Sequence, residues 1–551
     1  MSRALRLLPL ALGLLAWLPT LWTAGWALDD RELIFGNPVI DGSAPWWTAF
    51  ERAYFDHLGA AGQWRPLSSL SLRASHAIWN EQVAGYHLGN LALHLAVIAL
   101  AGAILRKRLE SRAWLFGLCV FAAHPALADV VAWISGRTSS LGALCGLAGV
   151  LVVVRARWPL GVALGSALSV GGALLAKEDG LLFAPLCLWL ASGQGRARFA
   201  SAFAGTTTAV LAIGGARWLA LGAFIPSAGS PALGSADLAT RLTIGGHEWI
   251  EALRISALPI DYPPQYRAAF LLARTDPLPD GLVATLGWAL ALLLPLATWL
   301  FRRQLERAAL LSAVLAPLAL LPVVQLVPLG EVFAPRFLYL PLLFAVPIIG
   351  ALHATLPRIG QRIAWACVPL VLVPLAWQRS TVYASRGAWR IEMLEHMPKD
   401  AASWNDLGLA HEESGRLLEA RAALTKATQL DPTYSRAWTN LGRLALAEGD
   451  EARALAHFER AAAMGPNNPI AHANLGMLRL RRGDSQGSEA AYRRATAVAP
   501  GMVSAWRGLA RARHAQGDTE AALGALDRAL HLSPADELAL DLRRRWTAET
   551  D

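Results

Sequence analysis

The stretch SRAWTNLGRLALAEGDEARALAHFERAAAMGPNN, residues 435–468, shares its pattern with the 34 residues before it and with two later blocks of equal length. Trp404, Trp438 and Trp506 occupy one common place, which His472 takes in the third block. A period of this length indicates a stack of helical pairs. The other recurring residues are Leu407, Leu441, Leu475 and Leu509; Gly415, Gly449, Gly483 and Gly517; Ala427, Ala461, Ala495 and Ala529; Pro432, Pro466, Pro500 and Pro534.

This pattern is typical of tetratricopeptide repeats, in which each unit forms two short helices. The glycine opens the turn between the helices, and the proline ends the second helix because proline cannot continue the hydrogen-bond ladder. Residues 537–551 are expected to form a capping helix, since the last repeat of a stack needs a polar outer face. We expect a domain at 391–551, with repeats at 401–434, 435–468, 469–502 and 503–536.

Stacked repeats form a concave groove that suits an extended peptide or a partner helix. Asn440 and Asn474 each precede a Leu-Gly pair, so their amides are candidates to hydrogen-bond a bound backbone. The alternative is that they are simply frequent residues of this repeat. We expect the groove to bind an acceptor polypeptide or a partner protein.

The chain divides sharply by charge near residue 390. Residues 1–390 contain 30 Lys/Arg and 19 Asp/Glu, whereas residues 391–551 contain 20 and 22. An apolar, basic part followed by a charge-dense, nearly neutral part indicates a membrane domain and then a soluble domain. The basic excess lies in the membrane part, so we expect no nucleic-acid partner. The four cysteines lie in apolar runs without a CxxC or Cys/His cluster, which argues against disulfides and a zinc site.

The membrane part contains eleven stretches that approach the length of about 20 apolar residues needed to cross a bilayer. Some, such as 180–194, are short, so the number of spans is uncertain by one or two. An all-α, multi-span domain is expected over 1–390. The stretches are 5–27, 87–105, 113–134, 138–154, 159–176, 180–194, 199–222, 281–301, 308–330, 337–356 and 363–378.

Basic residues gather in alternate turns between these stretches. The positive-inside rule places such turns, and with them the N-terminus, in the cytoplasm. The opposite side then receives the loops 28–86 and 223–280 and the repeats. The first stretch is alternatively a cleavable signal peptide, because small residues near Ala24 and Ala27 permit cleavage. The basic clusters are Arg106-Lys107-Arg108, Arg155 with Arg157, Arg196 with Arg198, Arg302-Arg303 with Arg307, and Arg358 with Arg362.

Ionisable residues gather at the outer edge of the predicted spans. The loop 28–86 contains aromatic, amphipathic segments that are expected to lie on the membrane surface. Charges that face lipid at this depth cost about 3 kcal/mol each, so these residues are expected to line one shared, water-filled cavity. They are His87 and His94, then His124, Asp129 and Arg137, then Lys177, Glu178 and Asp179, then Glu331 and Arg336.

Several motifs carry a family resemblance. LDDRELIFGNPVI, WRPLSSLSLR, HLGNLALH, HPALADVVAWISGR, KEDG and PRFLYLP occur in this order ahead of the repeats. The chain resembles a bacterial member of the transmembrane and tetratricopeptide-repeat protein O-mannosyltransferases, which have the GT-C glycosyltransferase fold. The resemblance implies transfer of a hexose such as mannose from a polyprenyl-phosphate carrier to a protein hydroxyl. It also implies a multi-pass protein of the bacterial inner membrane that acts on the periplasmic face.

The resemblance places the catalytic acids at Asp29 and Asp30. A hydroxyl needs a base that takes its proton, and a carboxylate suits this role. Asp29 is our first choice as the base, and Asp30 would orient it, bind the acceptor or hold a divalent ion, so metal dependence stays open. Relatives usually have an acid before the arginine of the last motif, where this chain has Pro335; Glu331 is a possible substitute. Both acids could instead simply end a helix at the membrane interface.

The leaving phosphate needs fixed cations, and a guanidinium can bind phosphate through two hydrogen bonds. Arg336 is the first candidate, followed by Lys177, Arg137 and Arg65. The supporting residues are expected to be His94, His124, Asp129, Glu178, Glu331 and Tyr339. Each has a structural alternative: Arg336 as an interfacial anchor, Arg137 and Lys177 as ion-pair partners of Asp129 and Glu178, and the histidines as packing residues. The lipid chain is expected in an apolar groove between spans.

Two other functions compete with this prediction. One is a transferase that modifies a glycan or lipid, and the other is a non-catalytic membrane scaffold whose repeats recruit partners for envelope assembly. A transporter is disfavoured because the chain has no repeated halves or paired interrupted helices. The absence of GxxxxGK[ST], GxSxG and HExxH argues against a nucleotide-driven pump, a serine hydrolase and a zinc protease.

Overall fold

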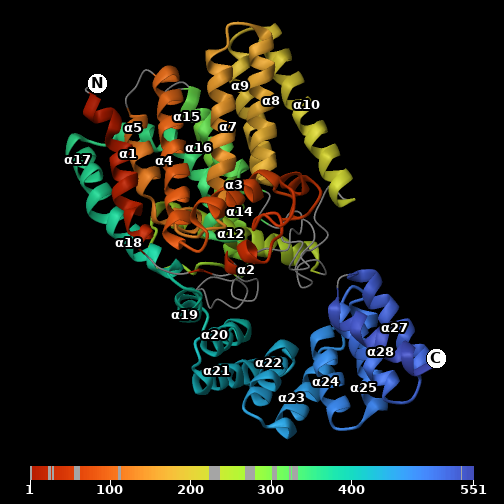
Figure 1. The fold of residues 1–551 in the computed structure, drawn as a ribbon. Helices are drawn as coiled ribbons and strands as arrows, with labels where there is room; N and C mark the ends of the chain where they lie inside the picture. The colour runs from red at the N-terminus through yellow and green to blue at the C-terminus, as the bar shows by residue number, and fades with distance from the viewer. Residues whose placement is uncertain are drawn as a thin grey trace. The chain divides into compact units, whose positions relative to one another are not determined.

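The computed structural model describes residues 3–22, 26–27, 30–54, 63–109, 113–222, 236–266, 280–300, 307–321, 324, 333–534 and 536–550. Within these ranges every regular element is a helix, which confirms the predicted all-α class (Figure 1). The chain forms two compact units, Met1–Trp389 and Arg390–Asp551, which divide next to the boundary expected from composition.

The membrane unit is a bundle of long helices whose direction alternates (Figure 1). α4 packs on α7, α7 on α8, α8 on α10, and α15 on α16. Because of the alternation, the described basic turns at 106–107, 155–157, 196–198 and 358–362 lie at one end of the bundle, and the described parts of the motifs that carry the family resemblance lie at the other. The helices of this unit are α1 (Arg3–Trp17), α2 (Asp30–Phe35), α3 (Pro66–Trp79), α4 (Val83–Arg108), α5 (Trp114–Ala123), α6 (Ala128–Val131), α7 (Arg137–Arg155), α8 (Pro159–Ala176), α9 (Phe183–Ser192), α10 (Arg196–Leu221), α12 (Leu238–Ala257), α14 (Asp280–Leu300), α15 (Arg307–Leu318), α16 (Tyr339–Thr355), α17 (Arg358–Cys367) and α18 (Val373–Ser380), and α19 (Arg386–His396) continues into the second unit.

Seven helices in the described residues are long and apolar enough to cross a membrane, so the chain is a multi-pass membrane protein. An eighth span results if the bent pair Trp114–Ala123 and Pro125–Val131 is one span. The other three predicted stretches form shorter helices: Leu5–Leu21, the ten-residue α9, and Arg307–Leu318, whose predicted stretch lies partly outside the described residues.

A bend and a tight turn separate α5 from α7. The chain bends by 53° where Pro125, which has no N–H, follows α5. It then doubles back at Gly136, where an added Cβ would lie 2.0 Å from the carbonyl oxygen of Asp129. At Gly180 an added Cβ would lie 2.4 Å from the backbone of Ala173. Both glycines therefore close tight turns. Residues 124–137 are called the α5–α7 turn below.

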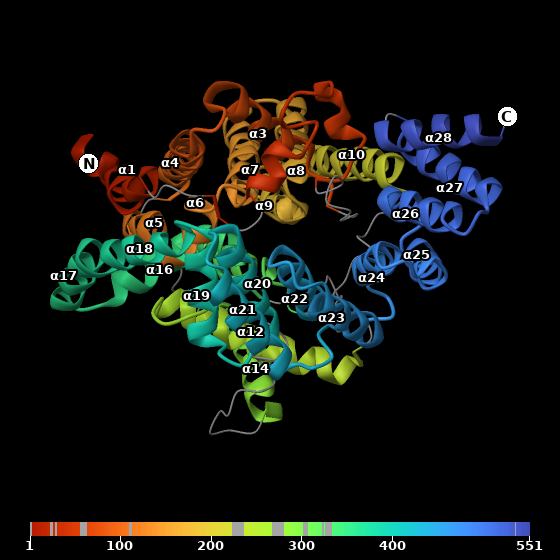
Figure 2. The same ribbon diagram turned by 60° about the horizontal axis from the view of Figure 1, so that its bottom comes forward.

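The second unit contains the four predicted repeats as helical pairs that follow one another (Figures 1 and 2). Gly415, Gly449, Gly483 and Gly517 have φ between +73° and +84°, a conformation that glycine adopts without strain. This confirms their predicted place between the two helices of each pair. The helices are α20 (Ala401–Glu413), α21 (Leu417–Leu430), α22 (Ser435–Ala447), α23 (Glu451–Met464), α24 (Pro469–Arg481), α25 (Ser485–Val498), α26 (Val503–His514), α27 (Thr519–Leu532) and the terminal α28 (Glu537–Thr550).

The aromatic position of the repeats has a polar function as well. The indole N–H of Trp404, Trp438 and Trp506 donates to the carbonyl oxygen six residues earlier, at 2.8 to 2.9 Å. His472 makes the same contact through Nε2, which lies 3.1 Å from the oxygen of Pro466. Histidine therefore preserves this hydrogen bond in the third repeat.

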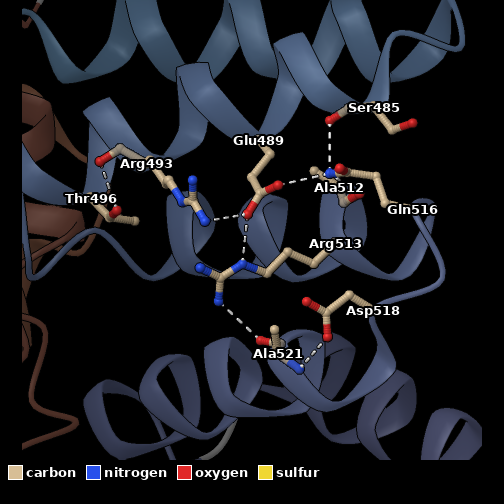
Figure 3. Close-up of polar contacts among 9 residues, drawn as sticks. All are labelled: Ser485, Glu489, Arg493, Thr496, Ala512, Arg513, Gln516, Asp518 and Ala521. Carbon is tan, nitrogen blue, oxygen red and sulfur yellow. Dashed lines mark hydrogen bonds and ion pairs between the residues drawn. The ribbon is translucent and has the colours of Figure 1, made fainter.

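A polar cluster joins the third and fourth repeats (Figure 3). The carboxylate of Glu489 on α25 accepts from Arg513 Nε at 2.9 Å and from Gln516 Nε2 at 2.8 Å, and it pairs with Arg493 at 2.9 Å. Burial would raise the pKa of Glu489, but the hydrogen bonds from Arg513 and Gln516 lower it below its ordinary value. The ionised carboxylate thus stabilises the contact between neighbouring repeats.

Candidate functional site

The α5–α7 turn is the centre of the candidate site because several distant segments bind to it. The first is the start of α2. Asp30 is fully buried, and its Oδ1 accepts from the backbone N–H of Ser135 at 3.0 Å and from its hydroxyl at 2.6 Å. Its Oδ2 accepts from Ala27 N at 3.3 Å. Such a buried carboxylate holds the turn in place, while the predicted action of Asp30 on Asp29 stays a prediction.

Arg137 fixes the other end of the turn. Its side chain is 1% exposed and donates to Asn90 Oδ1 at 2.9 Å, Ser75 Oγ at 2.7 Å and the carbonyl oxygen of Tyr86 at 3.0 Å. Asn90 in turn donates to the carbonyl oxygen of Trp133 at 2.8 Å. The predicted pairing of Arg137 with Asp129 does not occur, because these oxygens satisfy the guanidinium instead. Arg137 therefore joins α3, α4 and the turn.

Arg336 reaches the turn from the start of α16. Its backbone N–H donates to Asp129 Oδ2 at 3.2 Å. Its guanidinium carbon lies 5.5 Å from the ring centre of Trp133 and 5.1 Å from that of Phe337. The hydroxyl of Tyr383 donates to the other oxygen of Asp129. A buried carboxylate therefore fixes the backbone of Arg336 while aromatic rings flank its charged head.

A second buried carboxylate holds the segment that leads to Arg336. Glu248 on α12 accepts from the backbone N–H of Phe333 at 3.0 Å, and the backbone N–H of Tyr266 donates to Phe333 O at 2.9 Å. The Tyr266 hydroxyl donates to Glu251 at 2.7 Å. The residue before Arg336 is Pro335, not an acid. Two carboxylates from distant segments position the backbone here: Glu248 binds the N–H of Phe333, and Asp129 binds the N–H of Arg336.

Lys177 lies in the same region as Arg336. Its ammonium group lies 5.5 Å from the ring centre of Phe337, so one ring contacts both cations. It also donates to Ser139 Oγ at 2.8 Å and pairs with Asp179 at 2.9 Å. Its acidic partner is thus Asp179, not the predicted Glu178.

Glu178 instead bridges two arginines from distant parts of the chain. It accepts from Arg65 at 3.0 and 3.1 Å and lies 3.4 Å from Arg217. Burial would raise the pKa of the Glu178 carboxyl, but Arg65 and Arg217 lower it below its ordinary value. Arg65 therefore anchors the loop 28–86 to the helical bundle.

The two predicted supporting histidines are buried and make contacts within the protein. His94 Nδ1 lies 3.0 Å from the hydroxyl of Tyr339, and Nε2 lies 3.2 Å from the carbonyl oxygen of Ala122. His124 Nε2 lies 3.2 Å from the carbonyl oxygen of Ser256. These contacts orient the helices around the site, which is the packing alternative stated for the histidines.

Two predicted residues, Asp29 and Glu331, lie outside the described residues. Asp29 as the base and Glu331 as a substitute acid therefore stay predictions. In the ranges that the structure describes, no three His, Cys, Asp or Glu side chains are grouped so that they could hold a metal ion. The possible divalent ion also stays a prediction.

In the repeats, Asn440 is used for contacts between helices. Its amide donates to Asn405 Oδ1 at 2.8 Å, and its carbonyl accepts from Arg443 at 3.2 Å. Asn474 is half-buried in the next repeat. A peptide-binding role for either amide stays a prediction.

Sequence reasoning missed three contributors to the site. Tyr383 follows the last apolar stretch in an unremarkable polar segment, and nothing local links it to Asp129. Glu248 lies in HEWIEALR, whose spacing of acids over a helical turn is a weak sign of a buried face. Asn90 lies within the motif HLGNLALH. A polar amide near the start of a predicted span was the sequence feature that indicated a buried polar contact.

Comparison with known proteins agrees with this organisation. The tetratricopeptide repeat family model matches residues 383–435, 405–469 and 473–537. The chain is 34% identical over 184 residues to protein O-mannosyl-transferase TMTC2 of Homo sapiens, which covers 31% of this chain and 22% of the relative. It is 33% identical over 179 residues to Tmtc2 of Drosophila melanogaster, covering 30% and 19%. Protein O-mannosyl-transferase F38B6.6 of Caenorhabditis elegans is 23% identical over 436 residues, which cover 74% of this chain and 60% of the relative.

The matches therefore span about a fifth of the first relatives and less than two thirds of the third. Among solved structures, the crystal structure of MamA is 21% identical, covers 27% of this chain and 81% of its own, and has a TM-score of 0.24. YrrB, described as a TPR protein with an unusual peptide-binding site, is 21% identical, covers 29% and 82%, and has a TM-score of 0.25.

Proposed function

We propose that this relative of the protein O-mannosyl-transferases moves a hexose such as mannose from a polyprenyl-phosphate carrier to a Ser or Thr hydroxyl of a protein. The reaction takes place at the end of the membrane unit opposite the basic turns, on the periplasmic face of a bacterial inner membrane. One observation carries the proposal: the segments of Asp30 and Arg336 both bind the α5–α7 turn, through Ser135 and Asp129. A shared turn that contacts both segments supports placing the acidic and the cationic residues in one site.

The chemistry needs a base and a stabilised leaving group. The acceptor oxygen attacks the anomeric carbon, its proton passes to the carboxylate of Asp29, and the bond from that carbon to the phosphate oxygen breaks. Polyprenyl phosphate leaves with the electron pair. Asp30, which is fixed by Ser135, keeps the neighbouring segment in one position.

Arg336 is the cation that we assign to the phosphate, because its segment binds the same turn as the segment of Asp30. The head of Arg336 is flanked by the rings of Trp133 and Phe337, which hold a guanidinium without neutralising its charge. Asp129 acts on Arg336 through the backbone, so it is a positioning residue.

The repeats supply an acceptor-binding surface in this proposal. Four stacked units form an extended surface that suits a polypeptide. This role favours a protein acceptor over a free glycan or lipid acceptor, since such an array suits an extended polypeptide.

The test is transfer by the purified full-length chain. The protein is supplied with polyprenyl-phosphate mannose or another hexose donor and with Ser/Thr-containing polypeptides, and mass spectrometry follows glycopeptide and released polyprenyl phosphate. Arg336→Gln is expected to lower kcat/KM by about 100-fold, the loss typical of removing one fixed donor from a developing charge. Asp29→Asn is expected to remove product formation.

Arg362→Gln is the matched control, because Arg362 is an exposed arginine on α17 near the opposite end of the bundle. It should leave turnover unchanged. Folded wild-type protein that forms no product with any hexose donor would overturn the proposal. Unchanged transfer by Arg336→Gln would remove Arg336 from the phosphate site.

A further inference from the structure

A cavity of about 500 Å³ lies within the membrane unit, away from the site described above. It is lined by residues of α4, α7, α9, α15 and α16 and extends from Leu343 and Pro347 to the helix ends at Leu109, Gln194 and Arg307. Those ends belong to the basic turns. The volume is within the range of small-molecule sites in proteins, about 300 to 1,000 Å³.

The walls of the cavity are apolar, and its polar groups gather at one end. Of these, Ser192 and Ser312 donate to carbonyl oxygens of their own helices, at 2.8 and 2.9 Å. Gln194 accepts from Arg198, so the Arg198 guanidinium lies close to this polar end of the cavity, which is called the mouth below. The interior therefore offers hydrocarbon contact, while the mouth offers positive charge.

Arg307 is the notable residue of the mouth. It is exposed at the start of α15 and makes no hydrogen bond or ion pair with another residue in the described part of the chain. α15 itself has 12 residues and rises about 18 Å, well short of the roughly 30 Å of a bilayer core. The described helix α15 therefore does not cross the bilayer core by itself.

We propose that this cavity binds one anionic glycerophospholipid from the leaflet at the basic end. An acyl chain lies between α4, α9 and α15, and the phosphate lies at Arg307 with Arg198 nearby. Basic pockets between spans at the cytoplasmic side are known sites for anionic headgroups. The apolar walls favour a hydrocarbon chain over a water-soluble ligand, and the polar side chains Ser192, Ser312 and Gln194 already make hydrogen bonds within the protein.

This lipid is distinct from the proposed sugar carrier. The carrier phosphate is assigned to Arg336, which lies just before the N-terminal end of α16, whereas the present phosphate is assigned to Arg307 among the basic turns. The inference therefore stands whether or not the chain transfers sugar. A bound phospholipid would join α15 to α4 and α9 and support the bundle from the basic end.

The test uses the full-length chain in micelles and three photoactivatable lipids with the reactive group on the chain: phosphatidylglycerol, phosphatidylcholine and polyprenyl phosphate. Mass spectrometry locates the labelled peptides. Phosphatidylglycerol is expected to label peptides that contain Trp189 and Leu311 at least fivefold more than phosphatidylcholine does. Arg307→Gln should remove this preference, and Ala308→Phe, which fills the cavity, should remove the labelling.

Arg362→Gln serves as the control, because it removes an exposed arginine of α17 that does not line the cavity. It should leave both the labelling and the preference unchanged. Equal labelling by the two phospholipids, or labelling that Arg307→Gln leaves unchanged, would overturn the proposal. Labelling of the same peptides by polyprenyl phosphate alone would assign the cavity to the carrier chain and would also overturn it.

Discussion

The substitution Asp30→Asn tests whether a single buried carboxylate holds the α5–α7 turn. The carboxylate accepts two hydrogen bonds from Ser135 and one from Ala27 N. Asparagine has nearly the same shape, so the change removes charge and one acceptor while creating almost no cavity. Its amide nitrogen would face the N–H of Ala27 or the donors of Ser135, and neither arrangement satisfies all three donors.

The magnitude follows from these contacts. Hydrogen bonds to an ionised group contribute about 1.5 to 3 kcal/mol and neutral ones about 1 kcal/mol. Two bonds that become neutral, together with one donor that loses its acceptor, lower the free energy of opening of the turn by at least about 2 kcal/mol. Each 1.36 kcal/mol corresponds to a tenfold change, so the amide of Ser135 should exchange at least about 30-fold faster.

Hydrogen exchange of the full-length protein in micelles, followed by mass spectrometry of peptides from 128–139, measures this effect. Asp41→Asn is the matched control, because Asp41 Oδ1 accepts from Ser43 N within its own turn at 2.8 Å. Its effect on peptides 128–139 should be negligible. An unchanged exchange rate in Asp30→Asn, or equal acceleration by both variants, would refute the role assigned to Asp30.

Three further substitutions test other parts of the structure. Gly136→Ala should destabilise the membrane unit by about 3 kcal/mol, because the added Cβ would overlap the backbone of Asp129. Thermal unfolding in detergent measures this effect. The control is Gly215→Ala, which should be neutral because the space around Gly215 is open. Tyr339→Phe removes the hydroxyl that contacts His94 and should cost about 1 kcal/mol in the same assay, so an unchanged melting temperature would contradict the contact. Glu489→Gln should cost the repeat unit about 1 to 2 kcal/mol in urea unfolding at neutral pH. The pKa of Glu489 is lower in the folded than in the unfolded protein, so its contribution to the free energy of unfolding is complete above the unfolded pKa. This contribution is lost as pH falls through the folded pKa. A difference in the free energy of unfolding between wild type and Glu489→Gln that persists in acid would argue against this role.

Much of the architecture was predictable because it depends on local patterns. Helical apolar stretches and the 34-residue period are properties of neighbouring residues, so the repeats, their glycines and most spans were predicted correctly. The span count was less certain, since α9 and α15 are apolar but too short, and length alone does not show where a helix ends in a bundle.

The order of the motifs also predicted which residues belong to one region. It did not predict their partners. Arg137, Lys177 and Arg65 are similar cations in the sequence, yet Arg137 binds neutral oxygen atoms, Lys177 pairs with Asp179 and Arg65 pairs with Glu178. Such a difference depends on which oxygen atoms come within reach after folding.

The sequence by itself therefore determined the helices, the repeats and the gathering of charge at the two ends of the membrane unit. Only the tertiary structure decided what each charge does, because the deciding contacts join residues that are distant in the chain. Asp30 and Ser135 are 105 residues apart, and Asp129 and Tyr383 are 254 apart. No local period specifies such a pair; it forms because a buried carboxylate needs donors, and the packed bundle supplies them.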